Sequence, residues 1–146
     1  MPPDFKDPLA EHRKAVLIGL QLPNRDDLEL LLDELRLLLA NLSVETVAVS
    51  VQKKDRPDPA YMIGSGKAAD LKILAQASGA DLIVSNDMLT PVQLANLRKQ
   101  TECEIWDRAL VITKIFEKRA VTAEAKLQVE LARYRHQRST SACRDL

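Results

Sequence analysis

The sequence predicts an α/β fold: a small parallel-sheet βαβ domain followed by a C-terminal helical hairpin. Three observations lead to this prediction. Apolar runs rich in β-branched residues alternate with segments of helical periodicity, each about 10 to 15 residues long. Strands connected through helices in this way pair in parallel. After residue 107 the strand pattern stops, while apolar residues continue at helical spacing.

The first βαβ unit is expected over residues 15–51. Residues 15–22 (AVLIGLQL) are almost wholly apolar, as in a strand buried on both faces. Residues 24–42 place leucines at helical spacing after acidic residues, which predicts a helix. Residues 44–51 (VETVAVSV) are rich in β-branched side chains and predict the second strand.

The middle of the chain begins with a polar, proline-bearing loop at residues 52–60. Residues 61–64 (YMIG) are compatible with a short strand. Residues 67–79 predict a helix that ends at Gly79, because glycine readily takes the left-handed conformation that closes a helix.

The last strands of the expected sheet are residues 80–86 and 103–107. Between them, residues 90–100 predict a helix. Thr90 is the expected N-cap, and Pro91 fits the first helical position, where no backbone donor is needed.

Residues 108–137 predict two helices with a break near 119–122, where Thr122 could cap the second helix. Leu127, Leu131 and Tyr134 form a stripe along one face of that helix and need a partner surface. The preceding helix of the hairpin or self-association could provide it. Residues 1–13 and 138–146 show no periodicity and are expected to be a flexible and a disordered tail, flanking an α/β subdomain over 14–107.

Composition limits the class of protein. The 146 residues fit one domain with a helical extension, and 21 Lys and Arg balance 21 Asp and Glu, so a general polyanion binder is disfavoured. Cys103 and Cys143 match no metal-site spacing and are expected to be reduced thiols. Neither a secretory signal nor a membrane-length apolar run is recognisable, which indicates a cytoplasmic protein.

The segment Gly64-Ser65-Gly66-Lys67 invites comparison with a phosphate-binding P-loop. A P-loop needs a glycine five residues before the Gly-Lys pair and a hydroxyl after it, but Ala68 follows Lys67 here. A tight strand-to-helix turn is the simpler interpretation. Phosphate binding at the helix N-terminus, with Lys67 beside it, stays an alternative.

Catalytic groups are sparse. His12 and His136 have no evident carboxylate or nucleophile partner, and no catalytic or metal-ligating set stands out. The chain therefore resembles a binding module more than an enzyme.

Basic residues gather in two places although the net charge is zero. Such segregation is often only a solvated surface, but it also suits contact with RNA phosphates. Aromatic residues are 3%, so stacking on single-stranded bases is not expected. The first group is Lys53, Lys54 and Arg56, and the second is Lys114, Lys118, Arg119, Lys126, Arg133, Arg135 and Arg138.

Several stretches together resemble the N-terminal part of the HflX family of ribosome-associated GTPases. The most specific are RPDPAYMIGSGK and AKLQVELA, and the resemblance extends from about residue 14 to 135. It implies an α/β subdomain followed by a helical hairpin. It also implies docking on rRNA of the large ribosomal subunit, in a GTPase that splits or rescues ribosomes. The candidate docking residues are Lys53, Lys54, Arg56, Lys67, Lys114, Arg119, Lys126 and Arg133.

The resemblance implies that GTP and Mg²⁺ bind a separate P-loop domain. No such domain, and hence no cofactor, is expected within these 146 residues, so the chain itself is not expected to be an enzyme. Family members continue into a further loop, a returning helix and the GTPase domain. An excised domain, a frameshifted gene or a short paralogue would each explain the difference, and Ala109 stands where a threonine is expected. A nucleotide-binding domain and a non-functional truncated remnant are the alternative hypotheses.

Overall fold

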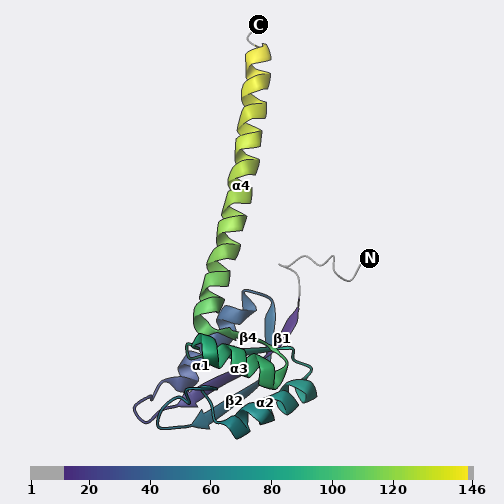
Figure 1. Ribbon diagram of the computed structural model, residues 1–146. Helices are drawn as coiled ribbons and strands as arrows, with labels where there is room; N and C mark the ends of the chain where they lie inside the picture. Colours follow the sequence, from purple (N-terminus) through teal and green to yellow (C-terminus); the bar gives the residue numbers. More distant parts are fainter. Residues whose placement is uncertain (1–11, 145–146) are drawn as a thin grey trace. The chain divides into compact units, whose positions relative to one another are not determined.

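The computed structural model describes residues 12–144, with side chains described through residue 137. Strands and helices alternate strictly along this part of the chain (Figure 1). The four strands are all parallel and lie in the order β2-β1-β3-β4. In chain order the elements are β1 (Arg13–Gln21), α1 (Leu28–Ala40), β2 (Val44–Lys53), α2 (Ser65–Ser78), β3 (Leu82–Ser85), α3 (Pro91–Thr101), β4 (Glu104–Asp107) and α4 (Arg108–Arg144).

The chain divides into two compact units, and the boundary falls inside α4. The first unit ends at Ile112 and contains the sheet, α1, α2, α3 and the first residues of α4. The second unit begins at Thr113 and consists of the rest of α4. The predicted α/β class with a parallel sheet is therefore confirmed.

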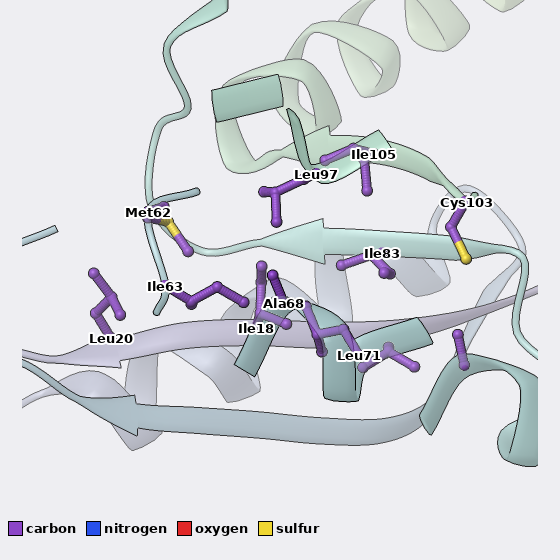
Figure 2. Packing of buried hydrophobic residues seen from close by; sticks show 12 residues of the cluster. Ile18, Leu20, Met62, Ile63, Ala68, Leu71, Ile83, Leu97, Cys103 and Ile105 are labelled. Atoms are coloured by element: carbon purple, nitrogen blue, oxygen red, sulfur yellow. The ribbon is translucent and has the colours of Figure 1, made fainter. Parts of the chain in front are cut away.

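One face of the sheet is covered by α2 and α3 (Figure 2). Ile18 of β1 and Ile83 of β3 point into this layer, where they meet Leu71 of α2 and Leu97 of α3. All four side chains are buried. Burial of a side chain of this size stabilises the fold by about 1.5–3 kcal/mol, so this layer is a main source of stability.

The opposite face of the sheet carries α1. Gly19 of β1 makes the close packing possible, because a Cβ atom at this position would lie 3.2 Å from Leu28 and 3.4 Å from Leu32. Leu28, Leu32, Leu35 and Leu39 recur at helical spacing and form the buried face of α1. The helix predicted from the leucine pattern is thus confirmed, with bounds a few residues shorter at each end.

Two helix ends that are determined by neighbouring residues also agree with the prediction. Thr90 caps α3 through a reciprocal capping box with Gln93, and Pro91 takes the first helical position. Gly79 follows α2 in the left-handed conformation, with φ of 72°. Residues 61–64 differ, because Met62 makes only an isolated antiparallel bridge to Asp58 instead of forming a strand.

The predicted C-terminal hairpin is wrong: α4 is one continuous helix from Arg108 to Arg144. Neither glycine nor proline occurs in this range, so nothing in the sequence forces a break. The Thr122 hydroxyl donates a hydrogen bond to the Lys118 carbonyl at 2.9 Å and remains inside the helix instead of capping a new one. The helix also includes 138–144, where a disordered tail was expected, whereas residues 1–11 of the expected N-terminal tail lie outside the described residues.

We expect Gly19→Val to destabilise the protein by about 1–3 kcal/mol, because the added methyl groups would press on Leu28 and Leu32. Urea unfolding followed by circular dichroism measures this change. Gly66→Val is the matched control, since no atom lies within 4 Å of a Cβ atom there. Equal stability of the two variants would show that α1 does not pack closely on β1.

Candidate functional site

The carboxyl ends of β1 and β3 are the place where an open parallel sheet of this order usually binds a ligand. The strand order β2-β1-β3-β4 reverses direction between these two strands, and such switch points leave a crevice. Here Arg25 and Asp87 occupy that point. The Arg25 guanidinium Nη2 lies 2.6 Å from Asp87 Oδ1, and its Nη1 donates to the Leu20 carbonyl at 3.0 Å.

Asp87 also connects the two strand ends through backbone contacts. Its Oδ2 accepts a hydrogen bond from the Leu20 amide of β1 at 3.3 Å. The Ser85 hydroxyl of β3 donates to the Asp87 carbonyl at 2.7 Å. The hydrogen bond to Asp87 raises the pKa of Arg25 above its ordinary value, with a further contribution from the charges of Asp87 and Asp27. The chain's own arginine therefore fills the place that a ligand would take.

Arg108, the first residue of α4, forms a second polar connection in the first unit. Its Nη1 donates to Asn86 Oδ1 at 2.9 Å and to the Leu31 carbonyl at 3.1 Å. Its Nη2 pairs with Glu34 of α1. This arginine ties α1 to the end of β3. Sequence reasoning did not identify either arginine, because their partners are distant in the chain and no local spacing signals them.

The basic loop after β2 contains Lys53, Lys54 and Arg56. Lys53 and Arg56 are exposed and Lys54 is half-buried, with its amide bound to the Gln21 carbonyl at 3.1 Å. The three cations therefore follow directly from the carboxyl end of β2, as the sequence predicts. None of the three has an ion-pair partner among the described residues.

The loop that follows is rigidly held by Asp58. Its carboxylate accepts hydrogen bonds from the Ala60 and Tyr61 amides at 2.7 and 3.0 Å. Its backbone exchanges two hydrogen bonds of 2.8 Å with Met62, whose side chain is fully buried. Gln93 of α3 donates to the Asp58 carbonyl at 2.8 Å. Much of the segment RPDPAYMIGSGK thus forms a fixed turn that anchors α2 and α3.

The phosphate-binding candidates Gly64, Ser65, Gly66 and Lys67 form the start of α2. The Gly64 amide already donates to Gln52 Oε1 at 2.8 Å, which removes one of the donors that an anion would need. Lys67 is half-buried, whereas Ser65 and Gly66 are exposed. The predicted strand-to-helix turn is wrong in one respect: no strand directly precedes α2, because residues 61–64 make only the isolated bridge through Met62.

The second unit carries the other basic candidates. Arg119, Lys126 and Arg133 are seven residues apart and hence lie on one side of α4, about 10 Å from each other along the axis. All three are exposed, and no ion pair joins them to a carboxylate within the described residues. Lys114 is half-buried. Leu127, Leu131 and Tyr134 are 56%, 43% and 57% exposed, so the predicted partner within a hairpin is absent from the described chain.

The remaining chemistry-bearing groups of the described residues include one cysteine thiol. Cys103 is a buried free thiol, and burial raises its pKa. Residues 12–137 contain no group of three or more His, Cys, Asp or Glu side chains that could hold a metal ion. In the same part of the chain no helix is long and apolar enough to cross a membrane.

Comparisons with known proteins agree with this architecture. The family model described as the GTP-binding GTPase N-terminal domain matches residues 29–117. GTPase HflX of Escherichia coli K12 is 37% identical over 123 residues, which are 84% of this chain and 29% of that protein. GTPase HflX of Thermofilum pendens is 39% identical over 127 residues, or 87% of this chain and 30% of that protein. The crystal structure of an SsGBP mutation variant has the same fold. The match covers 85% of this chain and 38% of the SsGBP chain, with a TM-score of 0.59 and 22% sequence identity.

The four parallel strands, with α2 and α3 on one face and α1 on the other, define a small parallel α/β domain. The chain belongs to the family of GTP-binding GTPase N-terminal domains, and its relatives are HflX GTPases. It spans about 29% of the length of the first of these relatives and corresponds to their N-terminal region.

We expect Asp87→Ala to lower the free energy of unfolding by about 1–3 kcal/mol, because it leaves the Leu20 amide and the Arg25 guanidinium without their acceptor. Urea denaturation measures this change. Glu102→Gln is the control, since it breaks only the exposed pair with Lys72 and should have no measurable effect. If both variants were as stable as the parent chain, the Arg25–Asp87 pair would not hold the strand ends together.

We also expect isothermal titration calorimetry to detect no binding of GTP or GDP to this chain. The reason is the occupied Gly64 amide and the lack of a P-loop hydroxyl after Lys67. Micromolar binding that Lys67→Glu abolished would instead assign a phosphate site to the start of α2.

Proposed function

We propose that this chain docks an HflX-type GTPase onto rRNA of the large ribosomal subunit, and that the exposed basic line Arg119, Lys126 and Arg133 of α4 makes the central contacts. The observation that carries the proposal is the regular seven-residue spacing of three exposed cations without ion-pair partners among the described residues. Cations arranged in this way can contact several phosphates of a duplex at once.

The distribution of charge supports phosphate contacts through α4 rather than through α1. Residues 113–137 contain six Lys and Arg and three Glu, whereas α1 contains three acidic residues and one arginine. The basic loop at Lys53, Lys54 and Arg56 provides a second cationic surface in the first unit. Two cationic surfaces and few exposed aromatic residues suit recognition of RNA by backbone charge and shape.

The role in ribosome splitting or rescue belongs to the complete GTPase in this proposal. The relatives are GTPases by name, and this chain corresponds to their N-terminal region only. GTP and Mg²⁺ would act in the P-loop domain of such a protein. The chain itself would bind the ribosome in the cytoplasm and would contribute no catalytic residue.

The test is co-sedimentation of the purified chain with large and small ribosomal subunits over a series of salt concentrations. We expect selective binding to the large subunit that weakens steeply with salt. Arg119→Glu, Lys126→Glu and Arg133→Glu together should abolish it, because three phosphate contacts contribute a salt slope of about 2–3.

The matched control reverses three other exposed cations, by Lys14→Glu, Arg98→Glu and Lys99→Glu, which make the same change in net charge on the first unit. This variant should bind nearly as the parent chain does. Equal loss in both variants would indicate a non-specific charge effect, and binding that ignored salt would contradict docking on phosphates.

A further inference from the structure

A groove runs between α1 and the outermost strand, β2, on the α1 face of the sheet. It has a volume of about 310 Å³, and Leu28 and Leu32 of α1 with Val49 and Val51 of β2 form its apolar floor. The two valines are 40% and 43% exposed, whereas Leu17 of β1, which pairs with Val49, is fully buried. A partly covered apolar floor of this size is typical of a binding surface.

The backbone of β2 is open along the same surface. Among the described residues this strand pairs only with β1, so its outer edge has free donors and acceptors. A register shift leaves Val47 without a partner in β1, and regular pairing resumes from Ala48 to Lys53. An unprotected edge of this kind accepts another strand readily. The segment 48–53 is therefore the part of β2 that is best suited to pairing.

The charges on this surface complement each other. Glu29 and Asp33 line the rim of the groove, are exposed, and belong to no ion pair within the described residues. Lys53 ends β2, is exposed, and also lacks such a partner. Its pairing with Gln21 of β1 places it on the same face as Val51, whose partner is Gly19. Arg36 also lines the groove, so this surface combines a rim of two carboxylates and one guanidinium, acidic overall, with an apolar floor and a cation at the end of the edge.

We propose that this surface binds a second copy of the chain, by antiparallel pairing of β2 with β2 of the partner about a two-fold axis at Val51. In this register Val51 faces itself and Lys53 lies opposite Val49 of the other copy. The lysine stem then covers the exposed valine, and its ammonium group reaches the rim formed by Glu29 and Asp33. The contact occurs twice by symmetry and joins the two sheets into one of eight strands.

The complementary charges of Lys53 and of the carboxylates Glu29 and Asp33 favour a second copy of the chain over an unrelated extended peptide as the binding partner. A peptide would need its own cation and its own apolar residue at the matching spacing, and this chain has both in Val51 and Lys53. None of Arg119, Lys126 and Arg133 belongs to this surface, which shares only Lys53 with the basic candidates for ribosome docking.

Sedimentation equilibrium over a range of protein concentrations tests the proposal. We expect a reversible dimer, and Val51→Lys should weaken it by at least about tenfold, because like charges then face each other at the axis. Leu37→Lys is the matched control, since this exposed α1 residue does not line the groove. A chain that stays monomeric at all concentrations, or a dimer that Val51→Lys leaves intact, would overturn the proposal.

A charge exchange tests the register independently of any loss of folding. Lys53→Asp or Asp33→Lys alone should each weaken the dimer several-fold, and the two together should restore it, because the ion pair re-forms with reversed polarity. Additive weakening in the double variant would contradict the contact between Lys53 and the acidic rim.

Disulfide trapping locates the axis. In a Cys143→Ser background, Val51→Cys should form an oxidised dimer rapidly, because the two thiols face each other. Glu45→Cys should not, since the two copies of residue 45 would be about 40 Å apart. Efficient trapping at 45 instead of 51 would exclude this arrangement.

Discussion

The structure of the first unit depends on β1. This strand pairs with a neighbour on each side and has the largest number of paired residues. Nine residues pair with β2 and four with β3, and Ala15 to Leu20 are all buried. Burial on both faces means that each neighbouring layer must fit against this strand. On one side Ile18 meets the layer of α2 and α3, and on the other Gly19 leaves room for the leucines of α1.

At the carboxyl end of β1, where most open α/β proteins bind a ligand, two side chains of the chain itself are paired. Arg25 and Asp87 bridge the ends of β1 and β3 and bind the Leu20 backbone from both sides. At the usual crevice the chain thus has a half-buried polar contact of its own. Both of our proposals therefore concern other surfaces: the basic loop after β2, the groove beside α1, and the cationic line of α4.

Features fixed by neighbouring residues could be predicted from the sequence. The capping box at Thr90, the left-handed Gly79 and the leucine face of α1 each depend on residues within a few positions of one another. The same holds for the failed P-loop, because Ala68 alone removes the metal-binding hydroxyl. The parallel sheet followed from the alternation of these elements.

Features fixed by contacts between distant residues could not be predicted. The Leu20 amide and Asp87 are 67 positions apart, and the groove beside β2 exists only after α1 has packed over β1. The prediction of a break in α4 was wrong for a different reason. The Thr122 hydroxyl can form a hydrogen bond inside a helix as well as at a helix cap, so threonine alone does not indicate where a helix starts. The basic candidates were identified by type, but their exposure and alignment required the folded chain.

The central claim is that the chain acts through α4 and not through the carboxyl edge of the sheet. Hydrogen–deuterium exchange of the chain bound to large ribosomal subunits tests it most directly, because each peptide reports on its own segment. The account predicts protection concentrated at 119–133, with the segment 64–67 at the start of α2 unchanged. Protection at 64–67 with none in α4 would contradict it and would assign the contact to the start of α2.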